Sequence, residues 1–318
     1  MRERMLATKT DTIAAPAPRV RPRRRKNDNL TGYLFILPFV IGFIGLTLFP
    51  TLASLYLSFT DYNMLGSPHW VGMDNFRQMF TQDDKYWQSV RVTVQYVFTA
   101  VPVRLVCALL IAMLLDRITA GAGFFRTVLY VPSLIGGSVA VSVMWKQLFS
   151  DKGAINALLT AVGLHPLPWL GDPHLALWTL VLLAGWQFGS PMLIFLAGLK
   201  NIPRELYEAA GVDGANAWQK FVRITLPMLT PVILFNVVMQ VIQAFLAFTP
   251  SYIISNGHGD PLDGTLLYVL YLFRNAFEFF KMGYASAMAW VLLAVIALCT
   301  ALIFRSSSYW VHYESESE

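Results

Sequence analysis

Long apolar segments constrain the fold of this chain more than any other feature of its sequence. Such segments, each about 20 residues or longer, lie at roughly 30–59, 92–115, 126–148, 175–199, 229–254 and 284–305. A helix of about 20 residues crosses the hydrocarbon core of a bilayer, and there it must satisfy its backbone hydrogen bonds internally. The sequence therefore predicts an all-α integral membrane protein with six transmembrane helices.

The composition agrees with a membrane protein. Of the 318 residues, 56% are hydrophobic and 14% are charged, whereas a soluble domain has about a quarter charged residues. Nine Trp residues fit aromatic belts at the two membrane interfaces. The two cysteines, Cys107 and Cys299, lie inside apolar segments, so we expect no disulfide framework.

The basic residues are concentrated at the N-terminus. The net charge is +5, and nine of the 24 Lys and Arg residues precede Leu30. Residues 1–29 have no continuous apolar core, so they do not resemble a cleavable signal peptide. We expect a disordered basic cytoplasmic tail that is attracted to anionic membrane lipid, and no nucleic acid as a partner.

The remaining charges predict the orientation. If the six segments span the membrane, the loops on one side, with the two tails, hold 16 Lys and Arg residues, and the other loops hold seven. Positive charge marks the cytoplasmic side. We therefore expect both termini, the C-terminal tail 306–318 and the loop 200–228 to be cytoplasmic, with one six-helix domain over 30–305.

The loop 200–228 is predicted to contain two short helices. Pro203 fits the first turn of a helix over 204–210, which Gly211 and Gly214 would break. Asp213 would cap the next helix, starting near Ala215, which the Leu226-Pro227 pair would end. A short exposed helix with small side chains can enter a groove of another protein, but the loop also suits an amphipathic connector on the bilayer.

One pattern in this loop resembles a known family. It runs from Glu208-Ala209-Ala210 through Gly214 and Ile224 to Leu226-Pro227. It resembles the "EAA" loop in permease subunits of bacterial ATP-binding-cassette (ABC) importers. The resemblance implies a type I ABC importer permease fold with a cytoplasmic coupling helix. It also implies that the residues docking on an ATPase are Glu208, Ala209, Ala210, Asp213 and Gly214.

Other motifs resemble the carbohydrate, or maltose-type, branch of these permeases. They are LSFTDY (57–62), WVGMDNF (70–76), the segment 125–132, GAIN (153–156) and GYASA (283–287). The outer loop 257–261 departs from the branch, since it reads GHGDP where G-G-P is frequent.

The resemblance implies a sugar or oligosaccharide importer in the bacterial inner membrane. The implied partners are a second homologous permease, two ATPase subunits that hold ATP and Mg, and an extracytoplasmic solute-binding protein. The chain itself has no G-x4-G-K-[S/T] motif and no Gly-Lys pair, so hydrolysis is expected on another polypeptide. We expect neither an enzyme nor a metal or cofactor site on this chain.

Polar residues inside apolar segments are candidates for a solute pathway, because such residues are costly in lipid. Asn236, Gln240, Gln243 and Ala247 fall on one helical stripe. Amides suit sugar hydroxyls, although they also bond neighbouring helices. Trp186, with Gln187 and Ser190, forms a second group.

Arg104 lies in the middle of the second apolar segment. It requires water, a carboxylate or a backbone carbonyl, and it can face the pathway or pair with a companion permease. A glycerol-phosphate importer of the same family is the alternative that Arg104 supports.

A stand-alone secondary transporter and a membrane-embedded enzyme are the rival classes. The first should show intramembrane carboxylates or inverted repeats, and the second a catalytic cluster.

Overall fold

The computed structural model describes residues 28–118 and 121–311. Nearly all of the predicted basic tail 1–29 lies outside the described residues, and the predicted tail 306–318 is described only as far as Val311. The chain divides between Leu52 and Ala53 into two compact units, which are considered separately.

The first unit is a single apolar helical run. It comprises α1 (Asp28–Gly42), the π-helical turn η1 (Phe43–Leu48) and the start of α2 (Phe49–Leu57). Residues Gly32–Leu57 are long and apolar enough to cross a membrane, and none of that window is buried within the chain. Phe39 and Phe43 stack with ring centroids 6.3 Å apart. An apolar helix exposed all round requires lipid or another protein around it.

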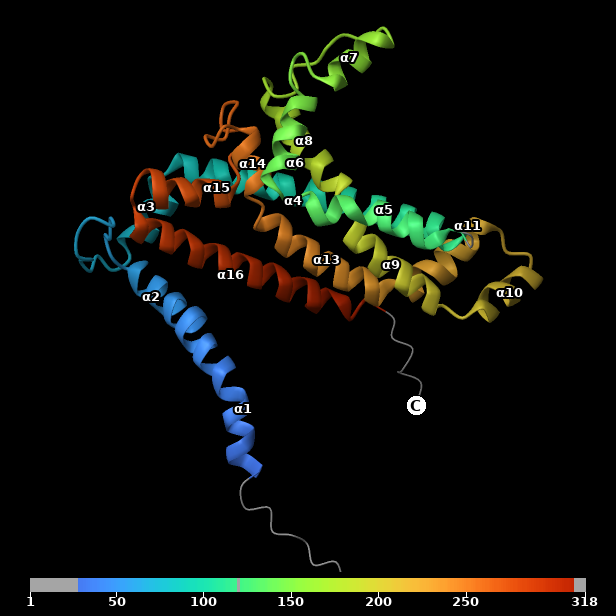
Figure 1. The fold of residues 1–318 in the computed structure, drawn as a ribbon, viewed down its shortest axis with the longest axis horizontal. Helices are drawn as coiled ribbons and strands as arrows, with labels where there is room; N and C mark the ends of the chain where they lie inside the picture. The colour runs from blue at the N-terminus through green and yellow to red at the C-terminus, as the bar shows by residue number, and fades with distance from the viewer. Residues whose placement is uncertain (1–27, 119–120, 312–318) are drawn as a thin grey trace, which may run out of the picture. The chain divides into compact units, whose positions relative to one another are not determined.

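The second unit is also helical, and its described part contains no strand beyond one isolated bridge between Thr60 and Trp70. Its elements (Figure 1) are α3 (Asp74–Thr81), α4 (Asp84–Asp116), α5 (Ala122–Ile135), α6 (Val139–Leu148), α7 (Ala154–Ala161), α8 (Pro173–Trp186), α9 (Gly189–Asn201), α10 (Arg204–Val212), α11 (Ala217–Lys220), η2 (Phe221–Thr225), α12 (Leu226–Met228), α13 (Thr230–Phe245), α14 (Thr249–Ile254), α15 (Tyr268–Phe273), η3 (Arg274–Glu278) and α16 (Met282–Ser307).

The described helices account for six apolar spans when each bent pair is counted as one span. Four unbroken helical spans are long enough: Gly32–Leu57, Asp84–Asp116, Thr230–Ile254 and Met282–Ser307. Two further spans are bent pairs, α5 with α6 at 96° and α8 with α9 at 43°. The all-α class and the number of spans are therefore as predicted. The second span begins at Asp84 instead of near residue 92, because Asp83 caps it by accepting from the Tyr86 N–H at 3.0 Å.

The third apolar span, predicted over 126–148, is sharply bent. Pro132 removes a backbone donor within α5, and the helix ends at Ile135 before Gly136 and Gly137. A new helix then starts at Val139, capped by the Ser138 side chain, which accepts from the Val141 N–H at 3.3 Å. Pro and Gly in the sequence marked where the chain could bend, but not the sharpness of the turn.

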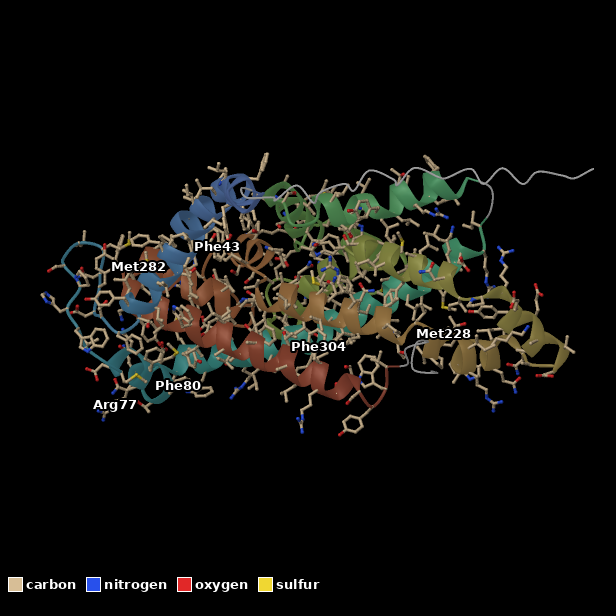
Figure 2. All side chains as sticks on the ribbon, turned by 90° about the horizontal axis from the view of Figure 1, so that it is seen from below. Phe43, Arg77, Phe80, Met228, Met282 and Phe304 are labelled. Atoms are coloured by element: carbon tan, nitrogen blue, oxygen red, sulfur yellow. The ribbon has the colours of Figure 1, made fainter. Side chains whose placement is uncertain are left out.

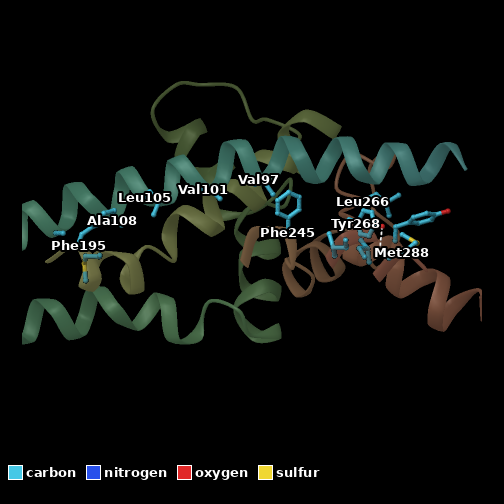
Figure 3. Close-up of a cluster of buried hydrophobic side chains, with 14 of the residues drawn as sticks. Val97, Val101, Leu105, Ala108, Phe195, Phe245, Leu266, Tyr268 and Met288 are labelled. Carbon is cyan, nitrogen blue, oxygen red and sulfur yellow. Dashed lines mark hydrogen bonds between the residues drawn. The ribbon is translucent and has the colours of Figure 1, made fainter. Parts of the chain in front are cut away.

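The core of the second unit is built around α4, which contacts α8, α9, α13 and α15. Figure 3 shows Val101, Leu105 and Ala108 along one face of α4, opposite Phe195 of α9. Further along the same cluster, the Tyr268 hydroxyl donates to the backbone oxygen of Met288 at 2.8 Å and so joins α15 to α16. Membrane helices associate through such close packing and interhelical hydrogen bonds.

Three of the sequence motifs form one tight junction. Gly283, which opens the GYASA motif, lies so close to the LSFTDY motif that a Cβ there would be 2.0 Å from the Thr60 oxygen. Its N–H donates to the Tyr62 oxygen at 2.9 Å. Asn75 of the WVGMDNF motif donates to the backbone oxygens of Ser58 and Thr60 at 2.9 and 2.8 Å. These motif residues therefore fix the end of α2 against α3 and α16.

The GAIN motif fixes the segment between α6 and α8. The Asn156 side chain is buried and donates to the backbone oxygen of Leu167 at 2.9 Å. Its Oδ1 accepts from the Leu167 N–H and the Trp169 indole, both at 3.0 Å. A Cβ on Gly153 would lie 2.3 Å from the Leu148 oxygen, so only glycine fits there. The loop 150–172 is therefore held by side-chain bonds.

The outer loop 257–261, whose GHGDP sequence differs from the G-G-P frequent in the maltose-type branch, is also held in place by hydrogen bonds. The Ser255 hydroxyl accepts from the Gly259 N–H at 3.0 Å, and Arg274 donates to the His258 oxygen at 3.0 Å. Gly257 and Gly259 have φ values of +83° and +87°, which L side chains rarely adopt. The loop therefore keeps a defined conformation despite its different sequence.

The two ends of the second unit are distinct. Figure 1 shows α3 and α15 at one end and α10 with α11 at the other. Figure 2 likewise shows Arg77, Phe80 and Met282 at the first end and Met228 at the second. The loops 60–91 and 200–228, which the sequence predicts on opposite sides of the membrane, thus lie at opposite ends of the structure.

Candidate functional site

The loop 200–228 contains the predicted helix, but that helix is longer than expected. Helix α10 starts after Pro203 and carries Glu205 in its first turn, where a carboxylate is favoured. It continues past Ala210 to Val212, with Gly211 inside it. Gly214, at φ +76°, then turns the chain, so the glycine that ends the helical run is Gly214.

The prediction that Asp213 caps the following helix is wrong. Asp213 is the C-terminal cap of α10, and its N–H donates to the Ala209 oxygen at 3.1 Å. Helix α11 starts at Ala217, and Asn216 caps it together with Gln219 in a reciprocal capping box, both bonds being 2.9 Å. Asn216, and not Asp213, caps α11 because Gln219, three residues later, completes a capping box with it.

The sequence predicts that the Leu226-Pro227 pair ends the second helix of the loop. This prediction is wrong. The chain passes from α11 through the π-helical turn η2 into α12, which contains Pro227, and α13 begins at Thr230. Proline lacks an N–H donor, and the wider π-helical turn directly before it accommodates the missing bond.

Helix α10 is tied to the rest of the loop along one side. The Tyr207 hydroxyl and the Thr225 hydroxyl of η2 form a hydrogen bond of 2.9 Å. The Lys220 amine lies 3.2 Å from the position that a Cβ on Gly211 would take. The small residue at 211 thus lets the following segment approach α10 closely, and the helix is fixed in position.

The other side of α10 is open. Among the predicted docking residues, Glu208, Ala209, Asp213 and Gly214 are exposed and Ala210 is half-buried. Val212 is 89% exposed and Trp218 is 70% exposed. Sequence reasoning did not include these last two residues, although two large apolar side chains in a polar loop were a usable signal. Together they make an exposed surface of mixed apolar and acidic character.

A cavity of about 240 Å³ lies between α4, α8, α13 and the start of α14. Three of the five predicted pathway residues line it: Arg104, Gln240 and Gln243. Gln187, from the second predicted group, also contributes. The other polar and aromatic lining residues are Tyr96, Phe248 and Thr249.

Two predicted pathway residues are not in the cavity lining. Trp186 instead packs on Trp145, with ring centroids 5.9 Å apart. Asn236 is fully buried, and neither polar atom of its side chain has a hydrogen-bond partner in the described part of the chain. Ala247 lines the cavity although it lies beyond Phe245, where α13 ends.

Arg104 bonds to a backbone carbonyl, one of the partners considered from the sequence. Its Nε donates to the Gln187 oxygen at 2.9 Å, and the Ser133 hydroxyl donates to the same oxygen at 2.8 Å. The Gln187 side chain donates to the Gly136 oxygen at 3.1 Å. The bend between α8 and α9 is therefore bonded both to α4 and to the bend between α5 and α6.

Comparisons with known proteins agree with this architecture. The model of the family "Binding-protein-dependent transport system inner membrane component" matches residues 85–310. The chain is 59% identical to the probable ABC transporter permease protein YesP of Bacillus subtilis, over 93% of this chain and 96% of that protein. It is 33% identical to the lactose transport system permease protein LacF of Rhizobium radiobacter, over 88% and 94% of the two chains.

A solved structure shares the fold. It is a chain of a bacterial alginate ABC transporter in complex with an alginate pentasaccharide-bound periplasmic protein. The TM-score is 0.76, over 88% of this chain and 94% of that chain, at 20% identity. The six-span helical chain therefore has the type I importer permease fold, and it belongs to the family of inner membrane components of binding-protein-dependent transport systems.

Proposed function

We propose that this chain is one permease subunit of an ATP-driven importer and that α10 couples it to a separate ATPase. The observation that carries the proposal is the combination of an anchored and an exposed side on α10. The Tyr207–Thr225 hydrogen bond holds the helix, while Glu208, Ala209 and Val212 remain exposed. A short rigid helix with small residues and an apolar tip suits a groove on a partner, to which it can transmit movement.

We further propose that the transported solute is a sugar or oligosaccharide. The cavity presents amides from Gln187, Gln240 and Gln243 beside the rings of Tyr96 and Phe248. Amides donate to and accept from hydroxyl groups, and aromatic rings offer apolar faces. Relatives named for lactose and arabinooligosaccharide transport support the same class of solute.

The complete importer would contain a second homologous permease, two ATPase subunits with their ATP and Mg, and an extracytoplasmic solute-binding protein. Exposed apolar side chains on α16, such as Leu298 and Phe304, leave surface for a companion chain and lipid. We propose the orientation that the basic residues predict. The cytoplasmic side then holds both termini and the loop 200–228, with its docking residues Ala210, Asp213 and Gly214.

A glycerol-phosphate importer is less well supported. Arg104 is the only basic residue lining the cavity, and its Nε already bonds to a carbonyl oxygen. Binding of a phosphate group generally uses several cationic or N–H donors. A stand-alone secondary transporter does not explain the exposed surface of α10.

The coupling proposal is tested in proteoliposomes that contain the whole transporter and its binding protein. The double variant Glu208→Lys with Gly214→Asp should abolish the rise in ATPase activity that solute-loaded binding protein causes. Asp151→Lys, at an exposed carboxylate before α7, is the matched charge reversal and should retain that rise. Equal stimulation of the double variant and the wild type would refute docking through α10.

The orientation is tested with single cysteines. In a chain with Cys107 and Cys299 replaced by alanine, Arg305→Cys, at an exposed site at the end of α16 and away from the docking residues, should react with a membrane-impermeant thiol reagent only in inverted vesicles. Lys152→Cys should react only in right-side-out cells. Reversed labelling would overturn the orientation without affecting the family assignment.

A further inference from the structure

A second, larger cavity lies close to α10 and has a different chemistry. Its volume is about 720 Å³, and the ends of α4 and α9 and the starts of α5 and α10 surround it. Its charged lining residues are Asp116, Arg117, Arg126, Lys200 and Arg204. Four basic residues and one acidic residue thus line a single cavity.

The basic residues are not neutralised within the described part of the chain. None of the four side chains makes a hydrogen bond or ion pair with another described residue. Arg126 is half-buried, and its Nε atom is buried without a hydrogen-bond partner. Like charges around one hollow repel each other, and a buried N–H without an acceptor costs about 1–3 kcal/mol. An anion in the cavity would remove both costs.

The position of the cavity indicates the kind of anion. Arg117 directly follows the apolar helix α4, Lys200 lies in the last turn of α9, and Arg126 lies near the start of α5. All three apolar spans end at this cavity, so its basic groups lie where lipid headgroups begin.

The arginines suit a phosphate group in particular. A guanidinium presents several N–H donors in a fixed plane and pairs with two oxygens of one phosphate. Arg117, Arg126 and Arg204 provide three guanidinium groups around the cavity, and Lys200 adds an ammonium. A carboxylate or a sulfate would also satisfy the charge, but the anionic group that every membrane phospholipid carries is a phosphate.

We propose that this cavity binds the phosphate headgroup of an anionic phospholipid. The leaflet is the cytoplasmic one if the orientation proposed above holds, whereas binding itself depends only on the charged cavity at the end of the spans. The bound headgroup would join α4, α5 and α9 at the base of α10, next to the Tyr207–Thr225 bond.

Native mass spectrometry of the purified transporter tests this proposal. The full complex is exchanged into detergent with phosphatidylglycerol or with phosphatidylcholine, and the lipid retained on this chain is counted. The double variant Arg126→Gln with Lys200→Gln should retain phosphatidylglycerol about tenfold less well or worse, because two charged contacts are lost. Arg305→Gln, at the end of α16 and outside the cavity, should retain it as the wild type does.

Further measurements on the same samples distinguish the possible occupants of the cavity. Equal retention of the two lipids by the wild type, or unchanged retention by the double variant, would overturn the proposal. Displacement of phosphatidylglycerol by millimolar inorganic phosphate would assign the cavity to a soluble phosphate instead. If the double variant loses the ATPase subunits while its lipid retention is unchanged, the cavity serves a protein contact. None of these results depends on the transported solute, so the proposal of sugar import stands or falls separately.

Discussion

The guanidinium Nε of Arg104 lies 2.9 Å from the backbone oxygen of Gln187, the C-terminal cap of α8. A helix end leaves carbonyl groups without partners, and an arginine in the membrane requires an acceptor. Each group therefore satisfies the other. The pair also explains how a charged residue is tolerated in the middle of α4 without a carboxylate nearby.

Arg104→Met should destabilise the permease by about 1–3 kcal/mol, because it removes a charged hydrogen bond from a half-buried site. The Ser133 hydroxyl still donates to the Gln187 oxygen, so the bend between α8 and α9 should persist with one hydrogen bond fewer to stabilise it. Thermal unfolding of the purified transporter in detergent measures the change. Arg91→Met, at an exposed site on the same helix, is the control and should shift stability by about 0.5 kcal/mol or less. Equal shifts for both variants would contradict the assigned role of Arg104.

Gly283→Ala should prevent correct packing of α16 on the loop after α2. The new methyl group would lie 2.0 Å from the Thr60 oxygen, and the obstacle is backbone that cannot move aside like a flexible side chain. We expect a large loss of assembled transporter, measured by size-exclusion chromatography after membrane extraction. Gly123→Ala on α5 is the matched control, because no atom lies within 4 Å of its added Cβ. That control should be neutral, or stabilising by up to about 1 kcal/mol through better helix propensity. Normal assembly of the Gly283 variant would show that the close approach is not required.

Asp83 couples three elements at the end of the molecule that carries α3 and α15. Its Oδ2 accepts from the Tyr271 hydroxyl at 2.7 Å and from the Tyr284 hydroxyl at 2.6 Å. Burial and the hydrogen bond to Asp83 raise the pKa of Tyr271, so its hydroxyl stays protonated and able to donate. This stabilisation is present below the ordinary tyrosine pKa of about 10 and is lost only at higher pH.

The contribution of the Asp83 bonds is measured by a double-mutant cycle. Asp83→Asn and Tyr271→Phe should each lower stability at pH 7, and the coupling between them should be about 1–3 kcal/mol. Tyr309→Phe, at a side chain that is 88% exposed, should have no effect. A coupling near zero would show that the two groups act independently in the folded protein.

The sequence predicted the apolar spans well, because hydropathy depends only on local composition. It did not predict the bend at Gln187, since that position is neither proline nor glycine. The sequence groups Trp186 with Gln187, yet adjacent residues on a helix point about 100° apart, and of the two only Gln187 lines the cavity. Asp213 and Asn216 are both good caps, and only the bond geometry shows which residue begins α11. Local propensity thus located the elements, whereas tertiary contacts selected the side chains that line the sites.

Asn236 offers a test that separates transport from stability. Both polar atoms of its amide are buried without a partner in the described residues, so the side chain carries a desolvation cost. Asn236→Leu replaces the amide with an apolar group of similar size and should leave stability unchanged or raise it by about 1–3 kcal/mol. If the amide serves the solute pathway in another conformation or beside a companion permease, uptake should fall while assembly is normal.

Thermal unfolding and sugar uptake measured on the same preparation distinguish the outcomes. Val238→Leu, two residues away and also buried, is the control for a change of core volume. A variant that is less stable than the wild type would instead identify Asn236 as a hydrogen-bonding link between helices, and the pathway would then rest on Gln240 and Gln243.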